Sequence, residues 1–211
     1  MRALAIALRV LATLAYPFAV YLGVTRWGPR AVGLAVLVVA VPRALVAAKN
    51  ARRDDLAHAL RVPLTIGALA LCAAVLRDAR FMLAMPSLVN AAMLVHFAAT
   101  LRGDTPIIER FARMQVATLS EPERAWCRKV TVAWCVFFAV NAVVSAVLAL
   151  AAPVAWWALY TGALSYGLLG AMFTVEYVLR SMRFRRYGNA PHDRLMARLF
   201  PPITETAVRD G

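Results

Sequence analysis

The chain has 211 residues, 62% of them hydrophobic, and its mean hydropathy is +0.66. An ordinary soluble domain is roughly 45–50% apolar, so this composition argues against such a domain, which would expose a large apolar surface to water. The formal charge of +13 would suit nucleic acid, but no nucleic-acid-binding motif is present and the charges flank apolar stretches, so we expect anionic inner-leaflet lipid as the counter-charge.

Six apolar stretches follow one another along the chain, and a membrane-spanning helix needs about 20 apolar residues. The first could be mistaken for a signal peptide, but its apolar run continues past a normal h-region, so we expect a retained helix. The sequence predicts an all-α polytopic membrane protein of about six transmembrane helices arranged as three hairpins. The predicted spans are residues 3–24, 31–48, 60–76, 81–101, 130–152 and 154–179. They form a transmembrane domain over 1–182, followed by a basic cytoplasmic tail over 183–211.

The lysines and arginines predict the orientation of these spans. Of the 24 Lys and Arg, only Arg26, Arg30, Arg77 and Arg80 lie in the short turns between paired spans. The others lie at the N-terminus, in the longer connections and their margins, and in the tail, so the positive-inside rule predicts that both termini are cytoplasmic. A multi-pass protein of the bacterial inner membrane is the expected localisation. Three tryptophans are then expected at the outer interface, namely Trp27, Trp156 and Trp157.

The long connection over 102–129 contains an amphipathic segment at 105–116. Ile107, Ile108, Phe111 and Met114 recur at helical spacing there, whereas Glu109, Arg110 and Arg113 face elsewhere. We expect a helix lying on the inner leaflet, with a docking surface for a cytoplasmic partner as the alternative. The candidate lipid or partner contacts are Glu109, Arg110, Phe111, Arg113, Arg185 and Arg186.

Two further short elements are predicted outside the spans. Ser120 and Glu123 form a capping box that starts a helix continuous with the fifth span. In the tail, Leu195, Met196 and Leu199 predict a short surface helix ended by the prolines that follow.

Polar residues inside the spans are the best candidates for a functional site, because such groups are expected to face the bundle interior rather than lipid. Interhelical hydrogen bonding is the structural explanation, and a midplane cavity for a small molecule or lipid headgroup is the functional one. The candidates are Asn90, His96, Asn141, Tyr160, Thr161, Ser165, Tyr166 and Glu176. Rows of small residues, such as Ala163, Gly167 and Ala171, further predict close packing of the fifth and sixth spans.

The ionisable residues do not predict a catalytic or metal site. Glu176 lies four residues before Arg180, so an ion pair along one helix face is expected rather than a proton relay. The three histidines are scattered, and the three cysteines form no metal-binding spacing. We find no nucleophile elbow, P-loop or dinucleotide fingerprint, and therefore expect no cofactor, no metal and no catalytic residue.

Four segments of the second half stand out: the Pro-Ile-Ile-Glu-Arg-Phe run at 106–111, the Trp-Cys-Val-Phe-Phe run at 134–138 with Asn141, the run at 157–162, and Glu176-Tyr177. They resemble a family of small bacterial inner-membrane proteins encoded beside aryl polyene biosynthesis genes. The resemblance covers most of the second half of the chain, whereas the first half matches mainly in hydropathy and in Tyr16-Pro17.

More distantly, the Trp-x-x-Phe-Phe stretch and the polar position after Trp157 make the chain similar to intracellular septation protein A. At that position the resemblance implies asparagine, whereas this chain has Thr161, which keeps a hydrogen-bonding group but loses the amide. Members of the first family are sometimes labelled ketosynthases. The sequence does not support that chemistry, which needs a cysteine nucleophile with paired histidines in a soluble fold.

The resemblance implies a non-catalytic inner-membrane component of cell-envelope biogenesis, supporting assembly or export of an aryl polyene-type lipid. Its expected partners are the bilayer, anionic inner-leaflet lipids and other envelope or lipid-biosynthesis proteins. The alternative is a small transporter or flippase with a polar site near Asn90, Asn141 and Tyr166. A lipid-modifying membrane enzyme that uses His96 or Glu176 is a third hypothesis.

Overall fold

The computed structural model describes residues 2–50, 56–114, 118–185 and 191–201, and within these ranges the chain is helical and contains no strand. Four helical stretches are long and apolar enough to cross a membrane: Ala15–Val46, Arg80–Leu101, Glu121–Ala151 and Val154–Phe184. The all-α class is therefore confirmed for the described residues, together with the presence of helices long and apolar enough to cross a membrane. The number of six spans stays a prediction.

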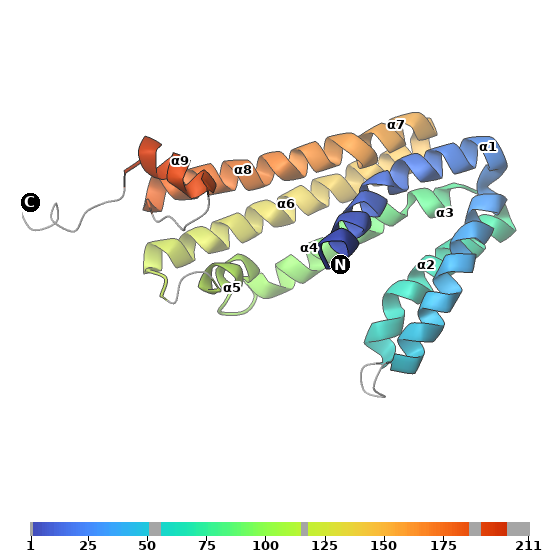
Figure 1. The fold of residues 1–211 in the computed structure, drawn as a ribbon, viewed down its shortest axis with the longest axis horizontal. Helices are drawn as coiled ribbons and strands as arrows, with labels where there is room; N and C mark the ends of the chain where they lie inside the picture. The colour runs from blue at the N-terminus through green and yellow to red at the C-terminus, as the bar shows by residue number, and fades with distance from the viewer. Residues whose placement is uncertain (1, 51–55, 115–117, 186–190, 202–211) are drawn as a thin grey trace, which may run out of the picture. The chain divides into compact units, whose positions relative to one another are not determined.

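Helix α1, Arg2–Asn50, runs through both of the first two predicted spans. It is interrupted only at Gly28, whose φ of 79° and ψ of 166° are non-helical. Glycine adopts a positive φ without the Cβ clash that other residues meet, and Pro29 follows with no N–H to continue the helix. The short turn predicted between the first two spans is therefore a sharp bend within α1, which changes direction there (Figure 1).

The second half of α1 lies beside α2, Leu56–Leu76 (Figure 1). Gly33 makes this approach possible, because a Cβ built on it would lie 2.5 Å from the carbonyl oxygen of Ala70 and 2.9 Å from the backbone nitrogen of Ala74. Small residues allow such close contact of helix backbones in membranes. Leu64–Leu76 is a shorter apolar helix than the four membrane-crossing stretches, so the third span also stays a prediction.

The remaining helices follow the predicted order with shifted ends. Helices α3, Arg80–Leu83, and α4, Met85–Leu101, together occupy the predicted fourth span, and α5, Ile107–Arg113, occupies the predicted amphipathic segment. Helix α6, Glu121–Ala151, is continuous from the capping box into the fifth span, as predicted. The Ser120 backbone N–H and hydroxyl each donate to Glu123 Oε2 at 2.7 Å, which confirms the reciprocal half of the box.

The predicted sixth span is one helical run with an irregular turn inside it. Helix α7, Val154–Leu159, passes into a π-helix, η2, at Tyr160–Leu164 and then into α8, Ser165–Phe184. Single π turns inside α-helices are rare and frequently occur at functional sites. The predicted tail helix is α9, Pro191–Leu199.

The contacts divide the chain into two compact units, which we describe separately. Unit 1 comprises residues 1–96 and 134–165, and unit 2 comprises residues 97–133 and 166–211. The core of unit 1 is small and consists of Val20, Ala70, Ala73, Met82, Leu83, Ala149, Trp157 and Ala158. Helix α8 continues two residues past 182, and the predicted division into a transmembrane domain and a tail stays a prediction.

Two features of the packing were not predicted. Trp157 is fully buried in the core of unit 1, whereas Trp27 and Trp156 are exposed, and the place of these tryptophans at the outer interface stays a prediction. The row that includes Gly167 is exposed, and a Cβ on that glycine would meet nothing within 4 Å, so it does not mediate close packing. Small residues permit close approach, but packing geometry decides which of them are used.

Candidate functional site

Three helices of unit 1 are joined by neutral hydrogen bonds among Ser87, Asn141, Ser145 and Tyr160, which we call the neutral cluster. The Ser87 and Ser145 hydroxyl oxygens are 2.9 Å apart, linking α4 to α6. The Tyr160 hydroxyl donates to Asn141 Oδ1 at 3.0 Å, linking η2 to α6. Asn141 Nδ2 donates to the Phe137 carbonyl at 2.9 Å, so both ends of this buried amide are bonded.

The other predicted intramembrane residues of unit 1 bond to the backbone of their own helices. Asn90 Nδ2 donates to the Pro86 carbonyl at 2.8 Å. Thr161 donates to the Trp157 carbonyl at 2.7 Å, and Ser165 donates to the Thr161 carbonyl at 3.0 Å. Such bonds satisfy a hydroxyl or amide in an apolar surrounding without a second helix. The structure thus joins Asn141 to Tyr160 but shows no direct hydrogen bond from Asn90 or Thr161 to either of them.

Two cross-helix bonds in unit 1 were missed by the sequence analysis. The Trp157 indole N–H donates to the Leu83 carbonyl at 3.0 Å, and the Tyr16 hydroxyl donates to the Met82 carbonyl, also at 3.0 Å. The sequence did contain a signal for the hydrogen bond from Tyr16 to Met82. Pro86 has no N–H to donate to the carbonyl four residues earlier, which belongs to Met82. A proline in a predicted span thus marks an acceptor that another helix can satisfy.

The three remaining predicted intramembrane residues are His96, Tyr166 and Glu176. His96 lies on α4 and is exposed. Tyr166 and Glu176 belong to α8 in unit 2. Arg180 Nε donates to Glu176 Oε1 at 2.8 Å, which confirms the predicted ion pair along the helix.

A second cluster lies in unit 2 and is built from charges; we call Glu109, Arg113, Glu121 and Arg124 the charged cluster. Glu109 is only 2% exposed, and its Oε1 accepts from Arg113 Nη2 at 2.7 Å and from Arg124 Nε at 3.2 Å. Arg124 Nη1 also donates to Glu121 Oε1 at 2.9 Å. Because a buried carboxylate needs partners, these contacts explain how Glu109 can be buried at all.

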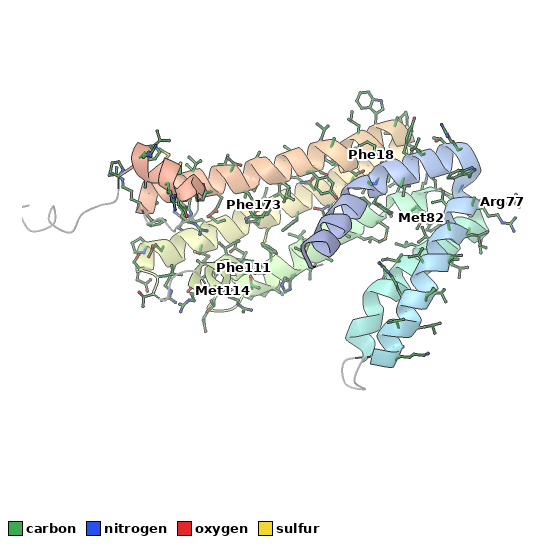
Figure 2. The ribbon with its side chains drawn as sticks, viewed as in Figure 1. Phe18, Arg77, Met82, Phe111, Met114 and Phe173 are labelled. Atoms are coloured by element: carbon green, nitrogen blue, oxygen red, sulfur yellow. The ribbon has the colours of Figure 1, made fainter. Side chains whose placement is uncertain are left out.

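On helix α5, Glu109 faces away from Phe111 and Met114, as the helical spacing predicts, and the structure shows in addition that Glu109 is buried. Ile107, Glu109 and Ala112 are buried, whereas Phe111 is 53% exposed and Met114 is 81% exposed (Figure 2). Arg110 is exposed and donates from Nε to the Thr105 carbonyl at 3.2 Å. The start of α5 is fixed by Thr100, whose hydroxyl oxygen accepts from the Ile107 N–H at 3.1 Å.

The C-terminal part of unit 2 is connected by a hydrogen bond and a cation–aromatic contact. The Tyr177 hydroxyl donates to Asp193 Oδ1 at 2.6 Å, which joins α8 to α9. The Arg183 guanidinium lies 5.6 Å from the centre of the Trp126 ring, within the range of a cation–π contact. Arg185 is exposed with a φ of 49° just after α8 ends, and Arg186 lies outside the described residues.

The potential metal ligands of the described ranges form no group of three, and Cys72, Cys127 and Cys135 are free thiols. Neither a protein-family model, nor a curated protein, nor a solved structure matches this chain. The fold and the hydrogen bonds therefore define the class: among the described residues, an all-helical protein with helices long and apolar enough to cross a membrane, and with one neutral and one charged cluster of polar side chains.

Proposed function

We propose that this chain is a six-span protein of the bacterial inner membrane, with both termini cytoplasmic, that acts without catalysis in cell-envelope biogenesis. In this role it supports assembly or export of an aryl polyene-type lipid. The positive-inside distribution of lysine and arginine supports the orientation. The break at Gly28 and the close pairing of α1 with α2 are consistent with a first hairpin.

One observation supports a non-catalytic role: the side chains best placed to react are already engaged in structural contacts. Both ends of the Asn141 amide are bonded, and Glu176 is paired with Arg180. A general acid or base must reach a substrate proton, and a carboxylate already paired with an arginine on its own helix is poorly placed for that.

Helix α5 provides the surface for contact with the inner leaflet. The charged cluster holds the helix by its buried side, so that Phe111 and Met114 are exposed beside the cationic Arg110. Apolar side chains next to a cation are the composition of a helix that lies at the surface of an anionic bilayer.

Deletion of the gene with lipid and pigment profiling tests the role in the envelope. We expect the membrane-bound aryl polyene-type lipid to decrease or to remain on the cytoplasmic side, and complementation with the whole chain to restore it. An unchanged lipid and pigment profile would contradict the proposed role.

Nitroxide labels at positions 111 and 114, placed in the whole chain in anionic nanodiscs, test the surface. We expect both labels to be more accessible to oxygen than to a water-soluble nickel reagent, as lipid-buried sites are. A label at Glu121, which is 85% exposed on its side chain, is the matched control and should show the opposite preference. Water-like accessibility at both test positions would exclude this contact.

The second candidate function is a small transporter or flippase with a polar site in the membrane. The neutral cluster favours it, because Ser87, Asn141 and Tyr160 come from three helical segments and Tyr160 begins a π turn. During transport, polar groups of the substrate would replace the present partners in these hydrogen bonds. Asn141→Leu should then abolish export while the protein remains folded in the membrane, and normal export by this variant would reject the transporter.

A further inference from the structure

Two arginines from distant parts of the sequence line one cavity in unit 1. Arg30 lies two residues after the bend in α1. Arg77, which is labelled in Figure 2, is the first residue after α2. The cavity has a volume of about 390 Å³ and is lined by Arg30, Leu34, Leu71, Ala74, Val75 and Arg77, which we call the arginine notch. The sequence analysis assigned these arginines only to separate turns.

Neither arginine is neutralised by the part of the chain that the structure describes. The side chains of Arg30 and Arg77 make no ion pair or hydrogen bond with those residues, and both are exposed. The acidic residue next to Arg77 in sequence, Asp78, accepts a hydrogen bond from the backbone N–H of Arg80 at 2.8 Å. The notch therefore presents two cationic forks without a bound carboxylate, and such forks match the oxygens of a phosphate.

The walls of the notch are apolar and continue into an exposed apolar surface. Leu34, Leu71 and Val75 are 49%, 53% and 68% exposed. Ala74 closes the notch against α1, where Gly33 lets the two helices touch. A free inorganic anion would gain nothing from such walls, whereas an acyl chain would bury them.

The backbone at Arg77 supports a specific role for this side chain. Its φ is 54°, which is a left-handed conformation; at the residue after a helix, this conformation is usually adopted by glycine. Arginine is unfavourable there, and residues held in such conformations cluster at ligand sites.

From these observations we infer that the arginine notch binds an anionic phospholipid, with the phosphate between Arg30 and Arg77 and an acyl chain along Leu34, Leu71 and Val75. This inference rests on the membrane placement in the proposed function, and it does not depend on the role in envelope biogenesis.

The test measures binding of a fluorescent phosphatidylglycerol to the whole purified chain in neutral detergent micelles. Arg30→Gln and Arg77→Gln should each weaken binding by about tenfold, because each removes one charge-assisted hydrogen-bond donor to the phosphate. Arg80→Gln is the matched control, since it removes the same charge close by but outside the notch, and its affinity should stay within about twofold of the original.

Competition distinguishes a lipid from a free anion. Unlabelled phosphatidylglycerol should displace the probe, whereas inorganic phosphate at the same concentration should not. Equal displacement by inorganic phosphate would overturn the lipid assignment. An equal loss of affinity in Arg80→Gln, or no loss in Arg30→Gln and Arg77→Gln, would overturn the site.

Two measurements keep these results interpretable. The helical content and the elution volume of each variant must match those of the original chain. If Arg77→Gln misfolds, Arg30→Gln alone tests the site, because it leaves the strained backbone position unchanged. Retained binding together with an unchanged profile after gene deletion would reject the envelope role alone.

Discussion

The two units of the chain satisfy their buried polar groups in different ways. In unit 1 the buried groups are amides, hydroxyls and an indole, and they bond to one another or to backbone carbonyls. In unit 2 the central group is the carboxylate of Glu109, which two guanidinium groups neutralise. The first solution suits helices within the hydrocarbon, and the second suits connections near the membrane surface.

This difference predicts how each unit responds to substitution. A neutral hydrogen bond between membrane helices contributes on average about 0.6 kcal/mol, because the separated helices find other partners. Removal of the partners of a buried charge costs about 3–5 kcal/mol, because the remaining charge has been taken out of water. Unit 2 should therefore be the more sensitive of the two.

The largest effect is expected from the double variant Arg113→Ala, Arg124→Ala, which leaves Glu109 buried without a partner. Since the two arginines are 46% and 39% exposed, we expect the lower end of the range, about 3 kcal/mol. Hydrogen exchange of the α5 amides should accelerate roughly 100-fold. Glu109→Gln removes the buried charge itself and should be milder; equal effects would contradict this explanation.

A smaller effect is expected where backbones touch in unit 1. Gly33→Ala places a Cβ 2.5 Å from the Ala70 carbonyl oxygen, and overpacking of this kind costs about 1–3 kcal/mol. Thermal unfolding in detergent should show the loss. Gly67→Ala is the matched control, because a Cβ there meets nothing within 4 Å and alanine favours helix by about 1 kcal/mol. A lower melting temperature for the control than for Gly33→Ala would refute the contact.

Trp157→Phe should destabilise the chain by about 1–2 kcal/mol, because the buried Leu83 carbonyl loses the indole donor. The same thermal measurement applies. Trp156→Phe changes an exposed neighbour and should have almost no effect. Similar losses in both variants would indicate a general requirement for tryptophan rather than this hydrogen bond.

The smallest effect is expected for Asn141→Leu, which removes the acceptor of the Tyr160 hydroxyl and should cost about 0.6 kcal/mol. Asn90→Leu is the comparison variant, because Asn90 bonds only to a carbonyl of its own helix among the hydrogen bonds described, and it should cost less. A large loss for Asn141→Leu would mean that the neutral cluster holds unit 1 together more strongly than such bonds usually do.

Much of the fold could be predicted because helix length and apolar composition are local properties. The capping box at Ser120, the pair of Glu176 with Arg180 and the break at Gly28 each depend on residues within about four positions. Burial depends on which helices meet, and that information is not local. The burial of Glu109 and Trp157 and the exposure of Gly167 were therefore not predicted.

The sequence by itself determined that this chain is built from apolar helices, where several of them begin or end, and which residues pair along one helix. The tertiary structure decided which distant residues share a site: Asn141 with Tyr160, Glu109 with Arg124, and Arg30 with Arg77. The physical reason is that hydrophobicity and helical periodicity act over one or two turns, whereas hydrogen bonds, ion pairs and cavities between helices depend on how whole helices approach one another.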